Sequence, residues 1–148
     1  MQISVQEAAF DFGAELAGCG QGRADVGAVV GFLGLVRDDT GTLKAMEIEH
    51  YPGMCERAIT AMAREAQARW GLGSVKIIHR FGRQEVGAQI MMVAVAARHR
   101  VAAFEAAEFL MDWLKSRAPF WKREITMMDA DWVEPKALDE AALHRWLG

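Results

Sequence analysis

Basic side chains that could bind an anion gather between residues 98 and 123 of this 148-residue chain. The segment carries six lysines and arginines against three carboxylates, although the whole chain has a formal net charge of −3. From Glu124 onward the balance reverses, and acidic residues dominate. A local basic patch on an acidic protein favours a small anionic ligand, because attraction to a polyanion would need net positive charge. We therefore expect no nucleic-acid partner.

Lys115 is the first candidate for chemistry, because it lies in the last turn of a helix expected over residues 101–117, shortly before Pro119. A lysine there can reach a cleft and act as an amine nucleophile or base if nearby cations lower its pKa. The helix C-terminus, however, favours the charged ammonium. Alternatively, Lys115 belongs to a solvated stripe and pairs with Asp112 three residues earlier. The residues alone leave its role open.

A second candidate is the expected strand that follows Pro119. Alternation along a strand places Phe120, Lys122 and Glu124 on one face. Trp121 and Arg123 then occupy the other face. An aromatic floor beside a lysine and a carboxylate could hold a flat heterocycle and its charged groups. An exposed edge strand with alternating charge fits the same pattern, and the residues do not decide between the two.

His99 and Arg100 stand where an expected strand over residues 89–97 meets the expected helix. The first turn of a helix offers free amides and a partial positive charge, so anions bind there readily. Arg100 can hold a phosphate through two hydrogen bonds, and His99 adds a titratable donor. An ordinary charged turn remains the alternative for this pair.

Two further features predict structure rather than chemistry. Gly18, Gly20 and Gly22 follow an expected helix and precede a strand, which is the reverse of a dinucleotide-binding loop. We expect a flexible connector there. Cys19 and Cys55 belong to no CxxC or cysteine–histidine pattern, so we expect free thiols and no metal site. Cys55 is expected to pack as a small apolar residue.

The elements that must position these side chains follow from hydrophobic periodicity and turn residues. The pattern predicts strands over residues 2–6, 26–36, 43–51, 75–81, 89–97, 121–126 and 132–133. Helices are expected over residues 7–16, 54–70, 101–117 and 139–147. Turn residues at 38–41 predict a hairpin between the second and third strands, and residues 82–87 are expected to form another turn. Paired strands with intervening helices indicate one α+β domain over residues 1–148.

The expected cellular compartment follows from the apolar segments. The longest apolar run, residues 26–36, is too short to span a bilayer and suits a buried strand. The first residues lack the basic and then apolar run of a signal peptide. We therefore expect a cytoplasmic protein without a membrane partner.

Five stretches together carry a family resemblance, at residues 34–37, 49–54, 78–82, 99–106 and 114–124. The most specific motifs are Tyr51-Pro52-Gly53-Met54 and Pro119-Phe120-Trp121-Lys122. In this order, and over about residues 24–133, the stretches resemble the catalytic large subunits of molybdopterin synthase.

The resemblance implies an α/β hammerhead-type fold with a mixed, largely antiparallel sheet and flanking helices. It also implies a homodimer of large subunits within a heterotetramer, for which the apolar strands around Val29 and Val93 are candidate surfaces. The implied partner is a small ubiquitin-like sulfur carrier whose C-terminal Gly-Gly ends in a thiocarboxylate. The implied activity is that of a sulfurtransferase acting on cyclic pyranopterin monophosphate (precursor Z), which forms the molybdopterin dithiolene in molybdenum cofactor biosynthesis. No metal or other cofactor is implied.

Matched by position, Lys115 and Lys122 resemble the two catalytic lysines of the family. The implied substrate pocket contains both lysines and six further residues: Val36, Arg37, His99, Arg100, Arg123 and Glu124. This agrees with the charge pattern, because an anionic substrate and a thiocarboxylate repel each other and need cations to hold them together. The chain departs from the family after Arg37, where Asp38 and Asp39 replace a common asparagine and histidine.

Overall fold

The computed structural model describes residues 1–126, 130–134 and 136–147, and these form two four-stranded sheets. In spatial order, the strands of the first sheet are β1 (Gln2–Gln6), β4 (Ser74–Arg80), β6 (Gln89–Ala97) and β2 (Ala28–Leu35). Strand β1 runs parallel to β4, and the other neighbours are antiparallel. The α+β class and the mixed, largely antiparallel pairing are therefore confirmed.

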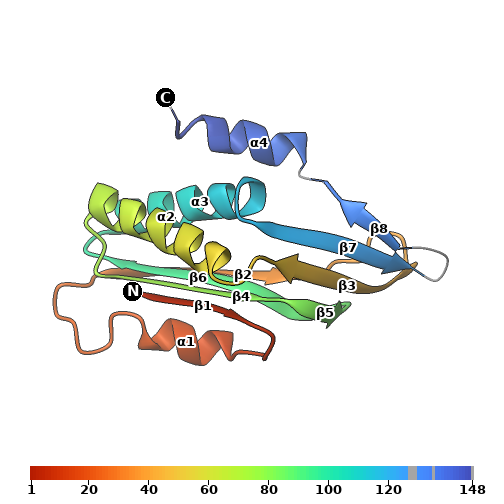
Figure 1. Ribbon diagram of the computed structural model, residues 1–148. Helices are drawn as coiled ribbons and strands as arrows, with labels where there is room; N and C mark the ends of the chain where they lie inside the picture. Colours follow the sequence, from red (N-terminus) through yellow and green to blue (C-terminus); the bar gives the residue numbers. More distant parts are fainter. Residues whose placement is uncertain (127–129, 135, 148) are drawn as a thin grey trace.

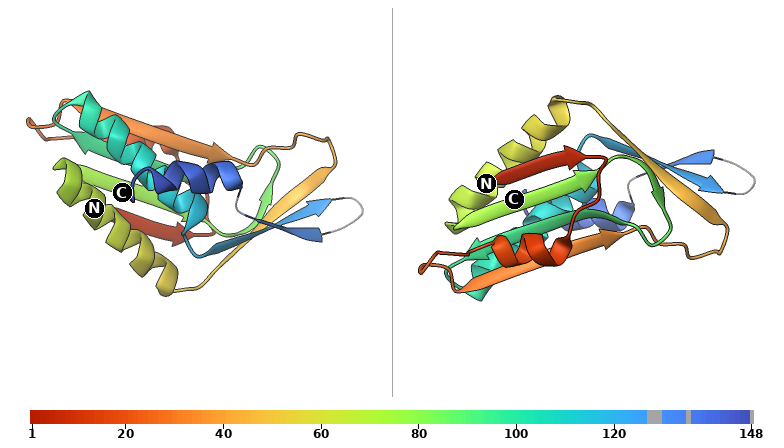
Figure 2. Two further views of the ribbon diagram at one scale, coloured as in Figure 1. Left: turned by 90° about the horizontal axis from the view of Figure 1, so that it is seen from above. Right: turned by 90° about the horizontal axis from the view of Figure 1, so that it is seen from below.

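The second sheet extends from one end of the first (Figures 1 and 2). In spatial order its strands are β5 (Gly82–Glu85), β3 (Leu43–His50), β7 (Phe120–Thr126) and β8 (Ala130–Val133). All of its neighbouring strands are antiparallel. The chain passes from one sheet to the other several times, so the junction of the sheets brings together side chains from distant parts of the sequence.

Helices cover both faces of the first sheet. Helices α2 (Met54–Trp70) and α3 (Arg100–Ser116) lie on one face, and α1 (Phe12–Gly18) lies on the other (Figure 1). The last helix, α4 (Ala137–His144), packs over α3. No helix among the described residues is long and apolar enough to cross a membrane.

Small buried residues let α3 run close along the first sheet. Its buried side chains are Ala103, Ala106, Ala107, Phe109 and Leu110. They pack against the fully buried centre of β6, where Val93 and Val95 have no exposed surface. This packing carries the last turn of α3, with Lys115, to the junction with the second sheet (Figure 1).

Periodicity predicted the long elements well and the short helices less well. The predicted ranges 54–70 and 89–97 are those of α2 and β6. The first helix begins later than predicted because the carboxylate of Asp11 caps it, accepting a hydrogen bond from the amide of Ala14 at 3.1 Å. The C-terminal helix begins and ends earlier than predicted.

The predicted hairpin between residues 26–36 and 43–51 is wrong. Strand β2 pairs with β6 in the first sheet, whereas β3 pairs with β5 and β7 in the second. The local turn does form, since the carboxylate of Asp38 accepts hydrogen bonds from the amides of Thr40 and Gly41. Turn residues reverse the chain locally, but burial decides which strands pair. Ala45 and Ile48 of β3 are fully buried where β3 pairs with strands that are distant in the sequence.

Two other predictions also fail. Residues 82–87 were expected to be a turn, but Gly82–Glu85 is the edge strand β5, whose polar sequence hides its pairing with β3. Val93 cannot form a dimer surface, because it lies fully buried in the centre of the first sheet. Val29, on the edge strand β2, is exposed and remains a candidate.

Candidate functional site

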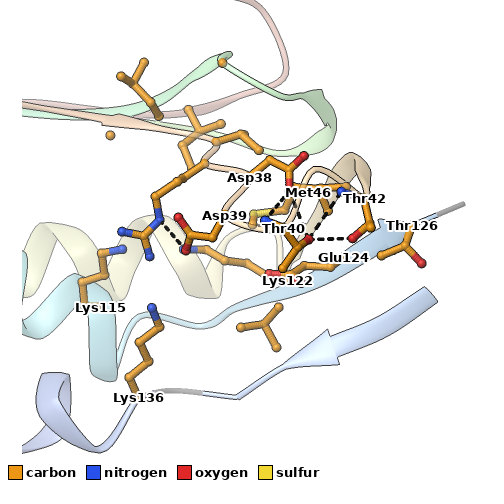
Figure 3. A pocket seen from close by; sticks show the side chains of 18 of the residues that line it. Asp38, Asp39, Thr40, Thr42, Met46, Lys115, Lys122, Glu124, Thr126 and Lys136 are labelled. Atoms are coloured by element: carbon orange, nitrogen blue, oxygen red, sulfur yellow. Dashed lines mark hydrogen bonds and ion pairs between the residues drawn. The ribbon is translucent and has the colours of Figure 1, made fainter. Parts of the chain in front are cut away.

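A cavity of about 710 Å³ opens where the second sheet meets the end of α3 (Figure 3). Five of the eight predicted site residues line it: Val36, Arg37, Lys115, Lys122 and Glu124. A smaller cavity of about 220 Å³ adjoins these lysines on the side of Phe120. The larger volume lies in the range of small-molecule sites.

Lys122 is the most perturbed cation of the site. Strand β7 places it opposite Ile48 of β3, so its partly buried side chain points from the second sheet into the cavity. Burial, followed by repulsion from Lys115, lowers the pKa of Lys122 to about 8, while Asp139 opposes the shift. A fraction of Lys122 is therefore the neutral amine near physiological pH, as an acid–base or nucleophilic role requires.

Lys115 faces the same cavity from the last turn of α3. Its alternative pairing with Asp112 is wrong, because that carboxylate accepts hydrogen bonds from Arg145 at 3.1 Å and from the indole of Trp146 at 2.6 Å. Within residues 1–126, 130–134 and 136–147, neither Lys115 nor Lys122 forms an ion pair. Both charges are available to an anionic ligand.

Sequence reasoning missed Lys136, which occupies the position just before α4 and lines both cavities. In Figure 3 the ammonium of Lys136 points toward the same space as that of Lys115. Asp139, one turn further along α4, lines the smaller cavity. Only the packing of α4 over α3 brings these residues to the site, and no local pattern around Lys136 indicates it.

The two faces of β7 behave as the alternation predicted. Glu124 lines the large cavity together with Lys122. Arg123 points to the opposite face, where it binds the carboxylate of Glu47 at 2.7 Å and lies over the ring of Trp132. The structure therefore does not bring Arg123 to the cavity.

Phe120 lines the smaller cavity but not the large one, and one face of its ring is covered by a histidine that sequence reasoning left without a role. The ring of Phe120 stacks on that of His79, with 3.8 Å between centroids and 18° between planes. His79 lines the smaller cavity with both lysines. The signal that could have found it is its position at the end of a buried strand, two residues before Phe81.

Arg37 lies at the exposed rim of the cavity, in the loop after β2. Its Nε is 3.2 Å from a carboxylate oxygen of Asp39, and both side chains are more than two-thirds exposed. An anion that binds Arg37 must therefore compete with Asp39.

His99 and Arg100 do not reach this cavity within one chain. They mark the start of α3, at the opposite end from Lys115, about 22 Å away along the helix axis. His99 instead lines a separate surface hollow beside Asp25 and Arg98. The basic segment 98–123 thus forms two cationic groups, one at each end of α3.

The assembled site can bind anions and move protons. Among the described residues, no cluster of three or more histidine, cysteine or acidic side chains could hold a metal ion. Cys55 packs as a buried apolar residue, as expected, and burial raises the pKa of its thiol to about 12. The charged side chains that line the large cavity are three lysines (Lys115, Lys122 and Lys136), the carboxylate of Glu124 and, in the loop at the rim, Arg37 with Asp38 and Asp39.

Comparisons with known proteins agree on one family. A family model described as "MoaE protein" matches residues 5–117. The molybdopterin synthase catalytic subunit of Cereibacter sphaeroides is 60% identical, over 99% of this chain and all of its own length. The solved molybdopterin biosynthesis MoaE protein of Burkholderia ambifaria is 46% identical, with a TM-score of 0.85, covering 99% of this chain and 98% of its own. The molybdopterin synthase structure from Staphylococcus aureus is 27% identical, with a TM-score of 0.83, covering 90% and 98%.

The pairing of Arg37 with Asp39 predicts that Asp39→Asn tightens the binding of inorganic phosphate to the cavity by up to about 5-fold, since exposed pairs are worth up to about 1 kcal/mol. Isothermal titration calorimetry at fixed salt measures this. Glu85→Gln is the matched control, because Glu85 pairs with Arg83 two residues away and does not line the cavity. Equal affinities for Asp39→Asn and wild type would show that Asp39 does not compete for Arg37.

Proposed function

Because the chain belongs to the MoaE family of molybdopterin synthase catalytic subunits, we propose that it is a sulfurtransferase acting on cyclic pyranopterin monophosphate. The sulfur donor is the C-terminal thiocarboxylate of a small ubiquitin-like partner, and the product is the molybdopterin dithiolene. The observation that carries this proposal is the convergence of Lys115 and Lys122, without ion-pair partners among the described residues, on a cavity of substrate size.

The two lysines have different surroundings, and this supports a division of roles. Lys115 is exposed at the helix end, where the tail of a protein partner can reach its ammonium. Lys122 lies deeper, and its lowered pKa suits it to exchange a proton with the pterin. Lys115 thus binds the thiocarboxylate, while Lys122 exchanges a proton near the pterin carbon that receives sulfur.

Each transfer forms a carbon–sulfur bond on the pterin, where a carbon–oxygen bond breaks and its oxygen leaves, and it also breaks the bond between sulfur and the acyl carbon of the partner's tail. Water supplies the oxygen that returns this tail to a carboxylate, so sulfur leaves the partner without a change of oxidation state. The cations lower the repulsion between the two anionic reactants. No thiol of this chain takes part, which agrees with the burial of Cys55.

His99 and Arg100 belong to the proposed pocket only if a second copy of the chain supplies them. One chain holds them a helix length away from Lys115. In a symmetric homodimer, the start of α3 in one protomer can complete the cavity of its partner. We propose this arrangement, with one small subunit per large subunit in a cytoplasmic heterotetramer and residues 1–148 acting as one domain.

Lys115→Ala is expected to abolish nearly all product formation when the variant receives thiocarboxylated partner and precursor. Oxidised, fluorescent molybdopterin derivatives measured by chromatography report the product. Lys44→Ala is the control, because Lys44 is an exposed lysine of β3 that does not line the cavity. Wild-type rates for Lys115→Ala would remove this lysine from the mechanism. Tight partner binding without turnover by the wild type would instead indicate a docking module.

Mixed dimers test the supply of Arg100 by a second protomer. Lys115→Ala and Arg100→Ala chains are each expected to be defective alone. After subunit exchange, half of the dimers are mixed, and each mixed dimer holds one intact site of two, so about a quarter of wild-type activity should return. If the mixture stays as inactive as its components, Arg100 does not act in the partner's site.

A further inference from the structure

His79 is a titratable side chain that the proposed mechanism leaves without a task. It lies at the end of β4, is only 4% exposed, and stacks face to face on Phe120 of β7. Its ring therefore spans the junction of the two sheets. It lines the 220 Å³ cavity and a further cavity of about 40 Å³, and Lys115 and Lys122 line both of these with it.

One hydrogen bond determines which ring nitrogen of His79 carries the proton. The Nδ1 atom lies 2.8 Å from the backbone carbonyl oxygen of Arg80. A carbonyl oxygen can only accept, so Nδ1 carries the proton and donates it. In a neutral ring, Nε2 is then an unprotonated acceptor, and in the described part of the chain it has no partner. The fold thus holds a free acceptor beside two ammonium groups.

The surroundings keep this ring neutral. Burial, followed by the charge of Lys122, lowers the pKa of His79 to about 3, and the charges of Lys115 and His50 act in the same direction. The bond to the Arg80 carbonyl opposes this shift without overcoming it. The groups that lower this pKa come from α3, β7 and β3 and are all basic, whereas the carboxylates of Glu134 and Asp139 line the 220 Å³ cavity together with the ring.

We propose that His79 is a positioning residue for Lys122: its Nε2 accepts a hydrogen bond from the ammonium of Lys122 in the substrate-loaded site and aims that lysine at the pterin. This inference rests on the proposed sulfur transfer and adds to it a residue that the family resemblance did not assign. The stack on Phe120 and the bond to Arg80 fix the ring on two sides, so Nε2 is the acceptor that stays in place while Lys122 moves.

A neutral acceptor suits this site better than a carboxylate would. A carboxylate at position 79 would form an ion pair with Lys122 and cancel the positive charge that holds two anions together. A neutral imidazole accepts one hydrogen bond and leaves that charge in place. It orients the lysine without repelling the thiocarboxylate or the phosphate.

The first test uses the wild-type chain and needs no turnover. Nitrogen-15 shifts of the histidine rings, recorded from pH 4 to 8, report tautomer and charge. We expect His79 to remain neutral, with the proton on Nδ1, over this whole range. A His79 that titrates near pH 6.5, or that carries its proton on Nε2, would overturn the proposal even if sulfur transfer occurs.

The second test compares three variants in the complete system of both subunits and precursor. His79→Phe keeps a ring against Phe120 but has no acceptor, and His79→Asn can keep the bond to Arg80 but is too short to reach the position of Nε2. Both are expected to lower kcat about 10-fold or more, because a hydrogen bond to a charged group is lost, with little change in KM. His79→Gln, whose amide oxygen can replace Nε2, is expected to recover most of kcat.

The pH profile of kcat separates positioning from mere packing. Losing an acceptor lowers the pKa of Lys122. The limb of the kcat profile that reports Lys122 should therefore move to lower pH in His79→Phe and stay in place in His79→Gln. A loosened core would admit water and move this limb to higher pH, which would overturn the proposal, as would a folded His79→Phe with wild-type kcat. Absence of product from the wild type refutes the sulfur-transfer proposal instead, and the nitrogen-15 shifts still decide the state of His79.

Discussion

The placement of the Lys122 ammonium at the junction of two sheets, with no ion-pair partner in the described part of the chain, is the constraint on which the rest of the site depends. Removing a charge from water is costly, and proteins usually respond by pairing it or by lowering its pKa. Here the response is the lowered pKa. The unfolded chain keeps this proton up to a pH of about 10.5, so folded Lys122 binds fewer protons between pH 8 and 10.5. Stability from this group therefore rises with pH across that window and is lowest near neutrality, where the site must work.

The architecture maintains this arrangement by assigning its parts to separate elements. Strand β7 holds Lys122 in the second sheet, and the small-residue packing of α3 brings Lys115 to the same point. His79 enters from the first sheet as a neutral member of the site. Lys136, just before α4, and Asp139 of α4 complete the smaller cavity, and Asp139 limits the lowering of the Lys122 pKa. No single element contains the site, so its electrostatics depend on the sheets meeting as they do.

The sequence predicted local properties better than long-range ones. Periodicity located α2, α3 and β6, and alternation along residues 120–124 correctly separated Lys122 from Arg123. Strand pairing was not predictable from turn residues, because β3 finds its neighbours by burying Ile48 against distant strands. Lys136 was missed for a related reason: only the packing of α4 brings it near Lys115. Charge counting indicated a single basic patch, but α3 separates Arg100 from Lys115 by its whole length, which sequence proximity cannot reveal.

The most direct measurement of this account is a titration of the Lys122 side chain. Nitrogen-15 or carbon-13 shifts of the lysine side chains, assigned with Lys122→Arg, report its pKa in the free protein. We expect a pKa of about 8 for Lys122, and a higher value in Lys115→Met, where one source of repulsion is gone while burial remains. A Lys122 that titrates near 10.5 in the wild type, or that does not respond to Lys115→Met, would contradict the description of the site as a partly buried lysine held close to a second, exposed lysine.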